Sequence, residues 1–283
     1  MPTHIENFSH GWLIPGLAYT MSCIGALLGL LATARARSVT GPSRAGWLIL
    51  AAFSIGGTGI WVMHFIAMLG FELPAADVRY SLGYTLVSML MAIVIVGIGL
   101  FMIGFSPRTP RVLLISGVVT GLGVAAMHYT GMAAVHVNGH IQYDTARVLT
   151  SILIAVVACT AALWAALYVR GALATIGAAL VMGLAVSGMH YTGMSAVTML
   201  LGPANTEPPG LEAWSFLLPL MVGISALTVV VLFILVLSPT EHELLDEARR
   251  AQPRQPHRGP APTYPVQAPQ TPPPAERSLF DPS

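Results

Sequence analysis

Long runs of apolar residues, separated by short polar segments, recur along most of the chain. A helix that crosses a bilayer needs roughly 20 predominantly apolar residues, and seven windows reach that length. Their continuous apolar character excludes a transmembrane β-barrel, whose strands alternate over about 10 residues. The pattern therefore predicts an all-α membrane protein with seven transmembrane helices, over approximately Trp12–Thr33, Trp47–Leu69, Tyr84–Phe105, Val112–Val135, Val148–Val169, Leu173–Leu200 and Trp214–Leu237.

The composition agrees with a surface that faces lipid. Only 9% of the residues are charged and 55% are hydrophobic, whereas soluble domains carry about 25% charged residues. We therefore expect a lipid bilayer around the helices and no nucleic-acid partner. The first ten residues contain no Lys or Arg, so the first apolar run is interpreted as a retained helix rather than a signal peptide. The isolated Cys23 and Cys159 are interpreted as small hydrophobic residues.

The arginines gather on one predicted side of the bilayer. The chain has no Lys, and its 13 basic residues divide into 11 on one side and 2, Arg79 and Arg147, on the other. By the positive-inside rule the richer side is cytoplasmic, which predicts an inner-membrane protein with its N-terminus outside. We expect a periplasmic N-terminus over residues 1–11, a membrane domain over 12–237 and a cytoplasmic tail over 238–283. The tail is rich in Pro and is interpreted as disordered.

Three stretches of the sequence align without gaps. They read GGTGIWVMHFIAMLG at 56–70, GLGVAAMHYTGMAAV at 121–135 and GLAVSGMHYTGMSAV at 183–197, and the last two are identical at 11 of 15 positions. Their histidines lie 64 and 62 residues apart (128 − 64 and 190 − 128), and each interval spans two predicted helices. We therefore expect three tandem two-helix repeats, formed by helices one and two, three and four, and five and six, plus a seventh helix outside them.

Each repeat carries His and Met at the same depth. His64, His128 and His190 all fall about 10 Å below the outer boundary at a rise of 1.5 Å per residue. A Met four residues later shares the helix face of each His, and a Met just before it faces a neighbouring helix. Imidazole with thioether favours copper, and the lack of neighbouring carboxylates or thiolates argues against Mg, Ca or structural Zn. The candidate metal ligands are Met63, His64, Met68, Met127, His128, Met132, Met189, His190 and Met194.

The same residues also have a plainer explanation. A His in a membrane helix often hydrogen-bonds a neighbouring helix, Met often fills the core, and repeats share residues by descent. Polar side chains are costly to retain in lipid, so the residues alone leave a metal site and a structural role both open. Tyr129 and Tyr191 are candidates either for contacting a ligand or for anchoring their helices. A metal-access site at the outer face is a further hypothesis, with candidates His4, His10, His136 and His140.

The repeated motifs resemble a known family. WVMHFIAML, AAMHYTGMAAV and SGMHYTGMSAV are similar to the three repeats of the MHYT family, a bacterial integral-membrane sensory domain, over roughly residues 10–237. The first copy departs from the pattern, with Phe65 and Ile66 in place of Tyr and Thr. The resemblance implies sensing of oxygen, carbon monoxide or nitric oxide through copper held by the motif Met and His residues. It implies a sensor rather than an enzyme, with output through a cytoplasmic signalling partner or the tail.

Three other functions stay open at this point. The first is copper transport or handling, although polar residues below the motif layer are scarce. The second is a membrane enzyme, with haem held by two of the histidines. The third is a scaffold in which the histidines are structural.

Overall fold

The computed structural model describes residues 11–71, 77–201 and 208–237 of the 283-residue chain. Within these ranges seven helices are long and apolar enough to cross a membrane, which confirms the predicted number and order of the spans. The expectations for the first ten residues and for the tail over 238–283 lie outside the described residues. The six uninterrupted helices are α1 (Leu13–Ser38), α4 (Leu82–Phe105), α5 (Pro110–Ala133), α6 (Thr145–Tyr168), α7 (Ala172–Ser195) and α8 (Ala213–Leu237).

The second span is composite. It begins as α2 (Gly41–Ala52), continues as the π-helix η1 (Phe53–Val62) and ends as α3 (Met63–Met68). A π-helix closes its hydrogen bonds over five residues rather than four, and such segments are often found at functional sites. The sequence pattern predicted one continuous helix here, because hydrophobic periodicity does not separate these two forms.

The predicted extension of the sixth span to Leu200 is wrong. Helix α7 ends at Ser195, and the residues after it form strand β4 (Val197–Leu201). This strand pairs antiparallel with β3 (Gly139–Tyr143), from Gly139 opposite Leu201 to Tyr143 opposite Val197. Its apolar composition suits a strand as well as a helix, so the sequence pattern could not mark the helix end.

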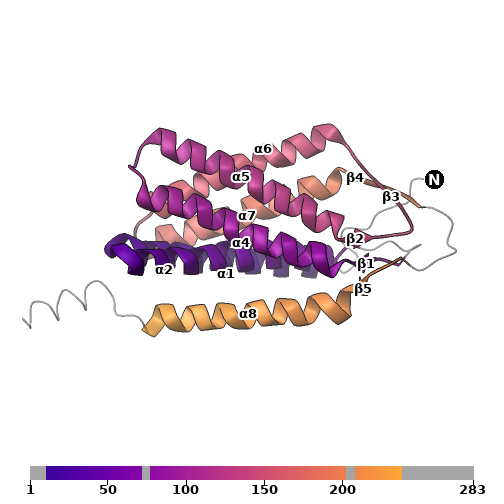
Figure 1. Ribbon diagram of the computed structural model, residues 1–283, viewed down its shortest axis with the longest axis horizontal. Helices are drawn as coiled ribbons and strands as arrows, with labels where there is room; N and C mark the ends of the chain where they lie inside the picture. Colours follow the sequence, from indigo (N-terminus) through magenta and orange to yellow (C-terminus); the bar gives the residue numbers. More distant parts are fainter. Residues whose placement is uncertain (1–10, 72–76, 202–207, 238–283) are drawn as a thin grey trace, which may run out of the picture. The chain divides into compact units, whose positions relative to one another are not determined.

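A second small sheet lies at the same end of the bundle (Figure 1). It has the order β2-β1-β5, formed by β1 (Arg79–Tyr80), β2 (Val135–His136) and β5 (Leu211–Glu212), all antiparallel. Backbone hydrogen bonds tie helix starts to helix ends there: Ser81 N donates to Ala134 O at 2.8 Å, and Asp144 N to Ala196 O at 2.8 Å. Burial raises the pKa of Tyr80, so its hydroxyl remains protonated and donates to Met68 O at 3.4 Å.

The first six spans form a closed ring. α1 packs against both η1 and α7, and the remaining helices contact their sequence neighbours in turn. α8 lies outside this ring against η1 and α1 (Figure 1). The architecture therefore has three two-helix units and a seventh helix, as the repeats predicted.

Glycines at one repeated position allow this ring to close. The first glycine of each 15-residue motif packs against the first helix of the next two-helix unit. A Cβ at Gly56 would lie 2.5 Å from Ala92 O on α4, and one at Gly183 would lie 2.6 Å from Cys23 Sγ on α1. The same replacement at Gly121 would collide with the backbone of Val156 on α6. Small residues let membrane helices approach closely, and here they do so in a cyclic order.

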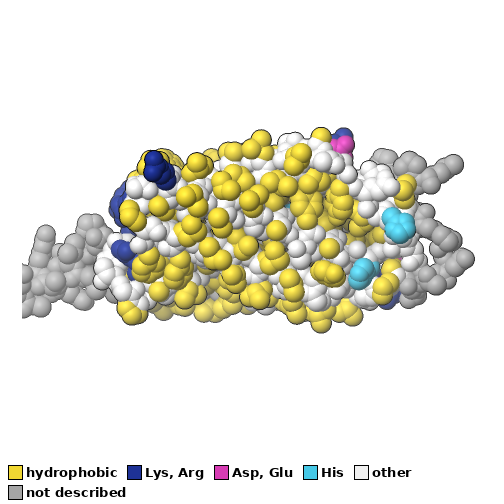
Figure 2. All heavy atoms as spheres, turned by 45° about the horizontal axis from the view of Figure 1, so that its top comes forward, with side chains coloured by type: hydrophobic (Ala, Val, Ile, Leu, Met, Phe, Trp, Pro, Cys, Tyr) yellow, Lys and Arg dark blue, Asp and Glu magenta, His cyan; other side chains and the backbone are white. Residues whose placement is uncertain are grey.

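Arginine and apolar side chains occupy different parts of the surface. Figure 2 shows hydrophobic side chains along the length of the bundle and more of the dark blue basic side chains at one end than at the other. That end is formed by the α1–α2, α4–α5 and α6–α7 connections, opposite the strands. Of the described arginines, the strand end has Arg79 and Arg147, and the other end has Arg35, Arg37, Arg44, Arg108, Arg111 and Arg170.

The packing of α8 can be tested by cross-linking. The hydroxyl oxygens of Thr58 on η1 and Thr228 on α8 lie 2.5 Å apart in the interior. The test uses a chain in which Cys23→Ala and Cys159→Ala remove the native thiols. In it we expect the pair Thr58→Cys and Thr228→Cys to form a disulfide, because the two side chains are already in contact and a disulfide joins Cβ atoms about 3.5–4.5 Å apart. Non-reducing gels and thiol labelling measure it. The control combines Thr58→Cys with Val229→Cys, since Val229 is exposed. Cross-linking of the control pair alone would contradict this placement of α8.

Candidate metal centre

Three helices of the ring each contribute one histidine to the same interior space. His64 lies on α3, His128 on α5 and His190 on α7, each within the last two turns before the strand end. Their exposed fractions are 1%, 0% and 1%. These side chains therefore share a buried layer near one end of the bundle, at the common depth that the repeat spacing predicted.

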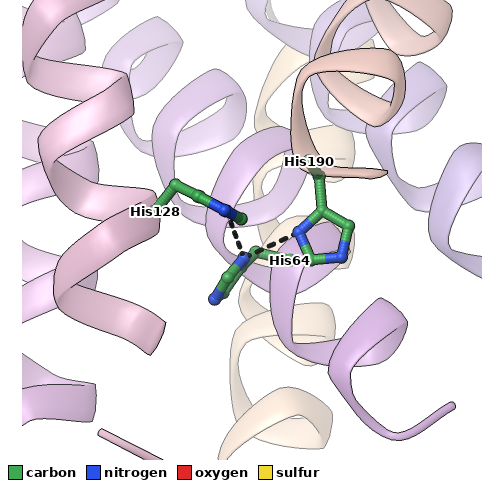
Figure 3. A group of neighbouring side chains, drawn as sticks. All are labelled: His64, His128 and His190. Carbon is green, nitrogen blue, oxygen red and sulfur yellow. Dashed lines mark hydrogen bonds between the residues drawn. The ribbon is translucent and has the colours of Figure 1, made fainter. Parts of the chain in front are cut away.

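The three rings converge through the Nδ1 atoms (Figure 3). His64 Nδ1 lies 3.0 Å from His190 Nδ1 and 3.2 Å from His128 Nδ1. One ring nitrogen from each residue falls within 4.8 Å of the other two. The rings stand nearly perpendicular to one another, with interplanar angles of 82–87°. Each ring thus points an edge, rather than a face, toward the shared centre.

This geometry fits a metal ion. Imidazole nitrogens bind Zn at about 2.0–2.1 Å, so nitrogens around one ion at that distance stand roughly 3.3–3.5 Å apart. The two Nδ1 separations fall a few tenths of an ångström short of this value, a difference that small ring movements can supply. A neutral imidazole has one N–H and one bare nitrogen. His64 Nδ1 therefore cannot donate properly to both neighbours, whereas a cation can accept lone pairs from all three rings.

The other ring nitrogens are seated against glycines. A Cβ at Gly131 would lie 2.5 Å from His64 Nε2, and one at Gly193 would collide with His128 Nε2. Both Nε2 atoms are buried, and neither has a hydrogen-bond partner among the described residues. The glycine of each MHYTGM motif thus makes room for the imidazole of the preceding repeat. Sequence reasoning missed this role, although the glycine recurs three residues after His in both full copies.

The six candidate methionines are buried around this layer. Met63 packs with Ala18 and Ala67 in a small cluster, and the other five belong to the main hydrophobic core. This burial suits a thioether ligand and an apolar core residue equally well, so their role as ligands stays a prediction. The methionines concerned are Met63, Met68, Met127, Met132, Met189 and Met194.

An aromatic ring packs edge-on against each histidine. Phe65, Tyr129 and Tyr191 each follow their histidine, with ring centroids 4.8, 4.9 and 5.0 Å away. The Tyr129 hydroxyl lies 2.7 Å from Ser151 Oγ on α6. Tyr129 therefore anchors α5 to α6. Phe65, at the same position of the first repeat, packs against its histidine but has no hydroxyl to form such a bond.

The histidines proposed for metal access are not drawn into the triad. His136 lies in β2, where its Nδ1 is 3.0 Å from Pro209 O, and His140 is exposed in β3. Both belong to the strand end, which is also the end nearer the triad. His4 and His10 lie outside the described residues, so the access hypothesis stays a prediction.

These features define a class: a multi-pass helical membrane protein with three tandem repeats and a buried cluster of three histidines. The family profile of the MHYT domain, described as a bacterial signalling protein N-terminal repeat, matches residues 57–117, 121–179 and 183–245. The chain belongs to this family. The matched units begin at the motif helix and so leave α1 outside, whereas the repeats predicted from the sequence begin one helix earlier and leave out the seventh span.

The chain is similar to proteins whose names refer to cyclic di-GMP enzymes or to signalling. The chain is 39% identical over 199 residues to the bifunctional diguanylate cyclase/cyclic di-GMP phosphodiesterase MucR of Pseudomonas aeruginosa, covering 69% of this chain and 29% of the relative. It is 34% identical over 209 residues to the cyclic di-GMP phosphodiesterase NbdA of the same organism, covering 71% and 26%. Signaling protein YkoW of Bacillus subtilis is 29% identical over 210 residues, covering 69% and 24%. The chain thus spans less than a third of each relative's length. No solved structure matches.

The glycine contact gives a test of the triad's packing. We expect Gly193→Ala to lower the melting temperature of the purified protein in detergent, because the added methyl group displaces the His128 ring and overpacking costs about 1–3 kcal/mol. The matched control is Gly188→Ala on the same helix, where a Cβ meets nothing within 4 Å. This control should melt at the original temperature or slightly above it. Equal melting temperatures for the two variants would contradict the contact.

Proposed function

We propose that this chain is a membrane sensory module that binds copper among His64, His128 and His190 and responds to a diatomic gas. The gas is oxygen, carbon monoxide or nitric oxide, and the response passes to a signalling partner. The observation that carries the proposal is the convergence of three buried Nδ1 atoms, two of them 3.0 and 3.2 Å from the third. A bound copper ion would supply an open coordination position for the gas.

The donor set favours a soft ion of low charge. The cluster that could hold a metal contains three imidazoles and no carboxylate or thiolate among the described residues. Burying an ion whose charge is not balanced by its ligands is costly, and the cost rises with that charge. Imidazole and thioether both suit Cu(I), so we assign this oxidation state to the resting site. The methionines one turn after each histidine are the proposed additional ligands.

The ring architecture supports a sensory role. Each histidine comes from a different two-helix unit, so a change in metal coordination would displace helices of all three units together. The strands that cap the triad end join the same helices, so that a shift can spread around the ring. The relative YkoW, which is named as a signalling protein, supports this role by analogy. We further propose that the protein lies in the bacterial inner membrane, with the arginine-rich end cytoplasmic by the positive-inside rule.

Copper transport or handling is the second candidate, but the interior below the triad gives it little support. The buried polar side chains described there carry hydroxyls rather than carboxylates or imidazoles. Ser54 Oγ donates to Leu50 O and Thr228 Oγ1 donates to Ile224 O. The hydroxyls of Ser116, Thr120 and Ser187 are buried without a described partner, but a neutral hydroxyl is a hard oxygen ligand that suits a soft copper ion poorly.

Metal content tests the proposal directly. We expect protein purified from copper-supplied cells to retain copper, and His128→Ala to lose most of it, because one of three ligands is removed. Elemental analysis by mass spectrometry measures both. The control is Gly188→Ala, where an added Cβ meets nothing within 4 Å, so this variant should keep its copper. Equal copper in all three proteins, or none in the wild type, would contradict copper binding by the triad.

Gas binding has its own readout. We expect the reduced, copper-containing protein to bind carbon monoxide and to show its stretching band in the infrared, and we expect His128→Ala to lose the band. Met132→Leu should move the band if the thioether is a ligand, because a weaker donor set changes the electron density on copper. An absent band in the copper-loaded wild type would contradict gas binding while leaving metal binding intact.

A further inference from the structure

The arginine-rich end of the bundle contains a second hollow, far from the triad. A cavity of about 180 Å³ lies where α1, α2, α4 and α6 meet. Its polar lining includes Arg37, Arg44, Arg108 and Ser106, and its apolar lining includes Leu48 and Leu100. Drug-sized ligands occupy pockets of roughly 300–1,000 Å³, so this cavity suits a small anionic group rather than a whole nucleotide.

Two of these arginines are held in place by main-chain carbonyls. Arg37 donates to Ala166 O and, at 3.1 Å, to Val169 O at the end of α6. Its Nε is buried without a partner among the described residues. Arg44 donates to Ala36 O, Val39 O and Gly104 O at 3.0–3.1 Å. Both guanidinium groups are therefore fixed beside the cavity before any ligand binds, which lowers the entropic cost of binding.

The positive charge at this end has no described counterpart. Arg108 is exposed and no hydrogen bond or ion pair is described for it, and the charges of Arg108 and Arg170 both act on Arg37. The acidic residues in the described ranges are Asp77, Asp144 and Glu212, which all belong to the strand end. Arginines gathered without an acidic side chain among the described residues repel one another, so an anion supplied from outside would stabilise this arrangement.

Another hollow, an apolar groove, lies on the helix pair next to the cavity. Its volume is about 430 Å³, and it lies between α2 and α4, lined by Ile49, Ala52, Ile93, Val94, Gly97, Ile98 and Phe101. Two aromatic rings join the hollows. The Arg44 guanidinium lies 5.9 Å from the Phe105 ring at the cavity, and Phe105 packs on Phe101 of the groove with ring centroids 5.6 Å apart. The small side chains at Gly97 and Ala52 form part of the groove lining.

We propose that these two hollows bind one anionic phospholipid, with its phosphate among Arg37, Arg44 and Arg108 and an acyl chain in the α2–α4 groove. Basic pockets between membrane helices recognise such headgroups, and guanidinium groups match phosphate oxygens with paired hydrogen bonds. The apolar groove favours a lipid over a free phosphate ester, because the ester has no acyl chain to fill it. The site is separate from the triad and does not depend on metal or gas binding.

The first experiment measures lipid binding to the purified full chain through its melting temperature in mixed micelles. We expect added phosphatidylglycerol to raise it and phosphatidylcholine to leave it unchanged. Arg108→Gln should weaken the apparent affinity for phosphatidylglycerol about fivefold, the effect typical of one basic residue near an anionic membrane. The matched control is Arg111→Gln, an exposed arginine three residues away that does not line the cavity. Equal losses in both variants would overturn the site in favour of unspecific surface charge.

The second experiment separates the phospholipid from other anions. Gly97→Leu fills the groove and should reduce the phosphatidylglycerol effect, whereas Gly177→Leu, at a position where a Cβ meets nothing within 4 Å, should not.

If inorganic phosphate stabilises the wild type as strongly as phosphatidylglycerol, the ligand is a soluble phosphate and the lipid proposal is wrong. It is also wrong if the carboxylates of the tail fill the cavity. Neutralising Glu241, Glu243, Asp246 and Glu247 in the full chain would then lower the melting temperature without lipid.

Discussion

Three neutral imidazole rings share one dry space, and the rest of the bundle depends on how that contact is satisfied. His64 Nδ1 faces the Nδ1 atoms of both other rings, yet a neutral ring offers one donor and one acceptor. Any metal-free arrangement therefore leaves ring nitrogens unpaired, at a cost of about 1–3 kcal/mol for each buried group. Such a cluster is difficult to explain as helix-to-helix hydrogen bonding alone. A bound cation would accept the Nδ1 lone pairs of all three rings and would leave the N–H of each ring on Nε2.

The glycines explain how three helices bring their rings so close. The first glycine of each motif sets the distance to the next unit, and the glycine after His-Tyr-Thr seats the ring of the preceding repeat. Packing, rather than a hydrogen bond to Nε2, therefore fixes the orientation of His64 and His128. Metal-binding histidines usually donate their second N–H to a neighbouring acceptor. At the proposed metal site, steric contact with a glycine backbone would take over that role for His64 and His128.

The sequence predicted what depends on local pattern and repetition. Seven apolar runs and three aligned motifs were enough for the helices, the three repeats and the common depth of the histidines. The strands were missed because Val197–Leu201 is too apolar to distinguish from the end of a helix. Likewise η1 was missed because a π-helix has no separate hydrophobic signature. The seating of His64 on Gly131 depends on how two repeats pack, which no single stretch of sequence contains. Repeated motifs marked the ligand types but not their contacts.

The spacing of arginine and histidine links the two ends of the bundle. Arg44, Arg108 and Arg170 each lie 20 positions before the triad histidine of their own repeat (64 − 44, 128 − 108 and 190 − 170). At 1.5 Å per residue a helix covers about 30 Å over this interval, so each arginine and its histidine lie near opposite ends of the bundle. The first repeat keeps the spacing although its helix contains η1. A repeat that places its arginine at one end of the bundle therefore also places its imidazole near the other end. The equal spacing thus brings the three histidines to one level of the bundle, where their ring nitrogens meet.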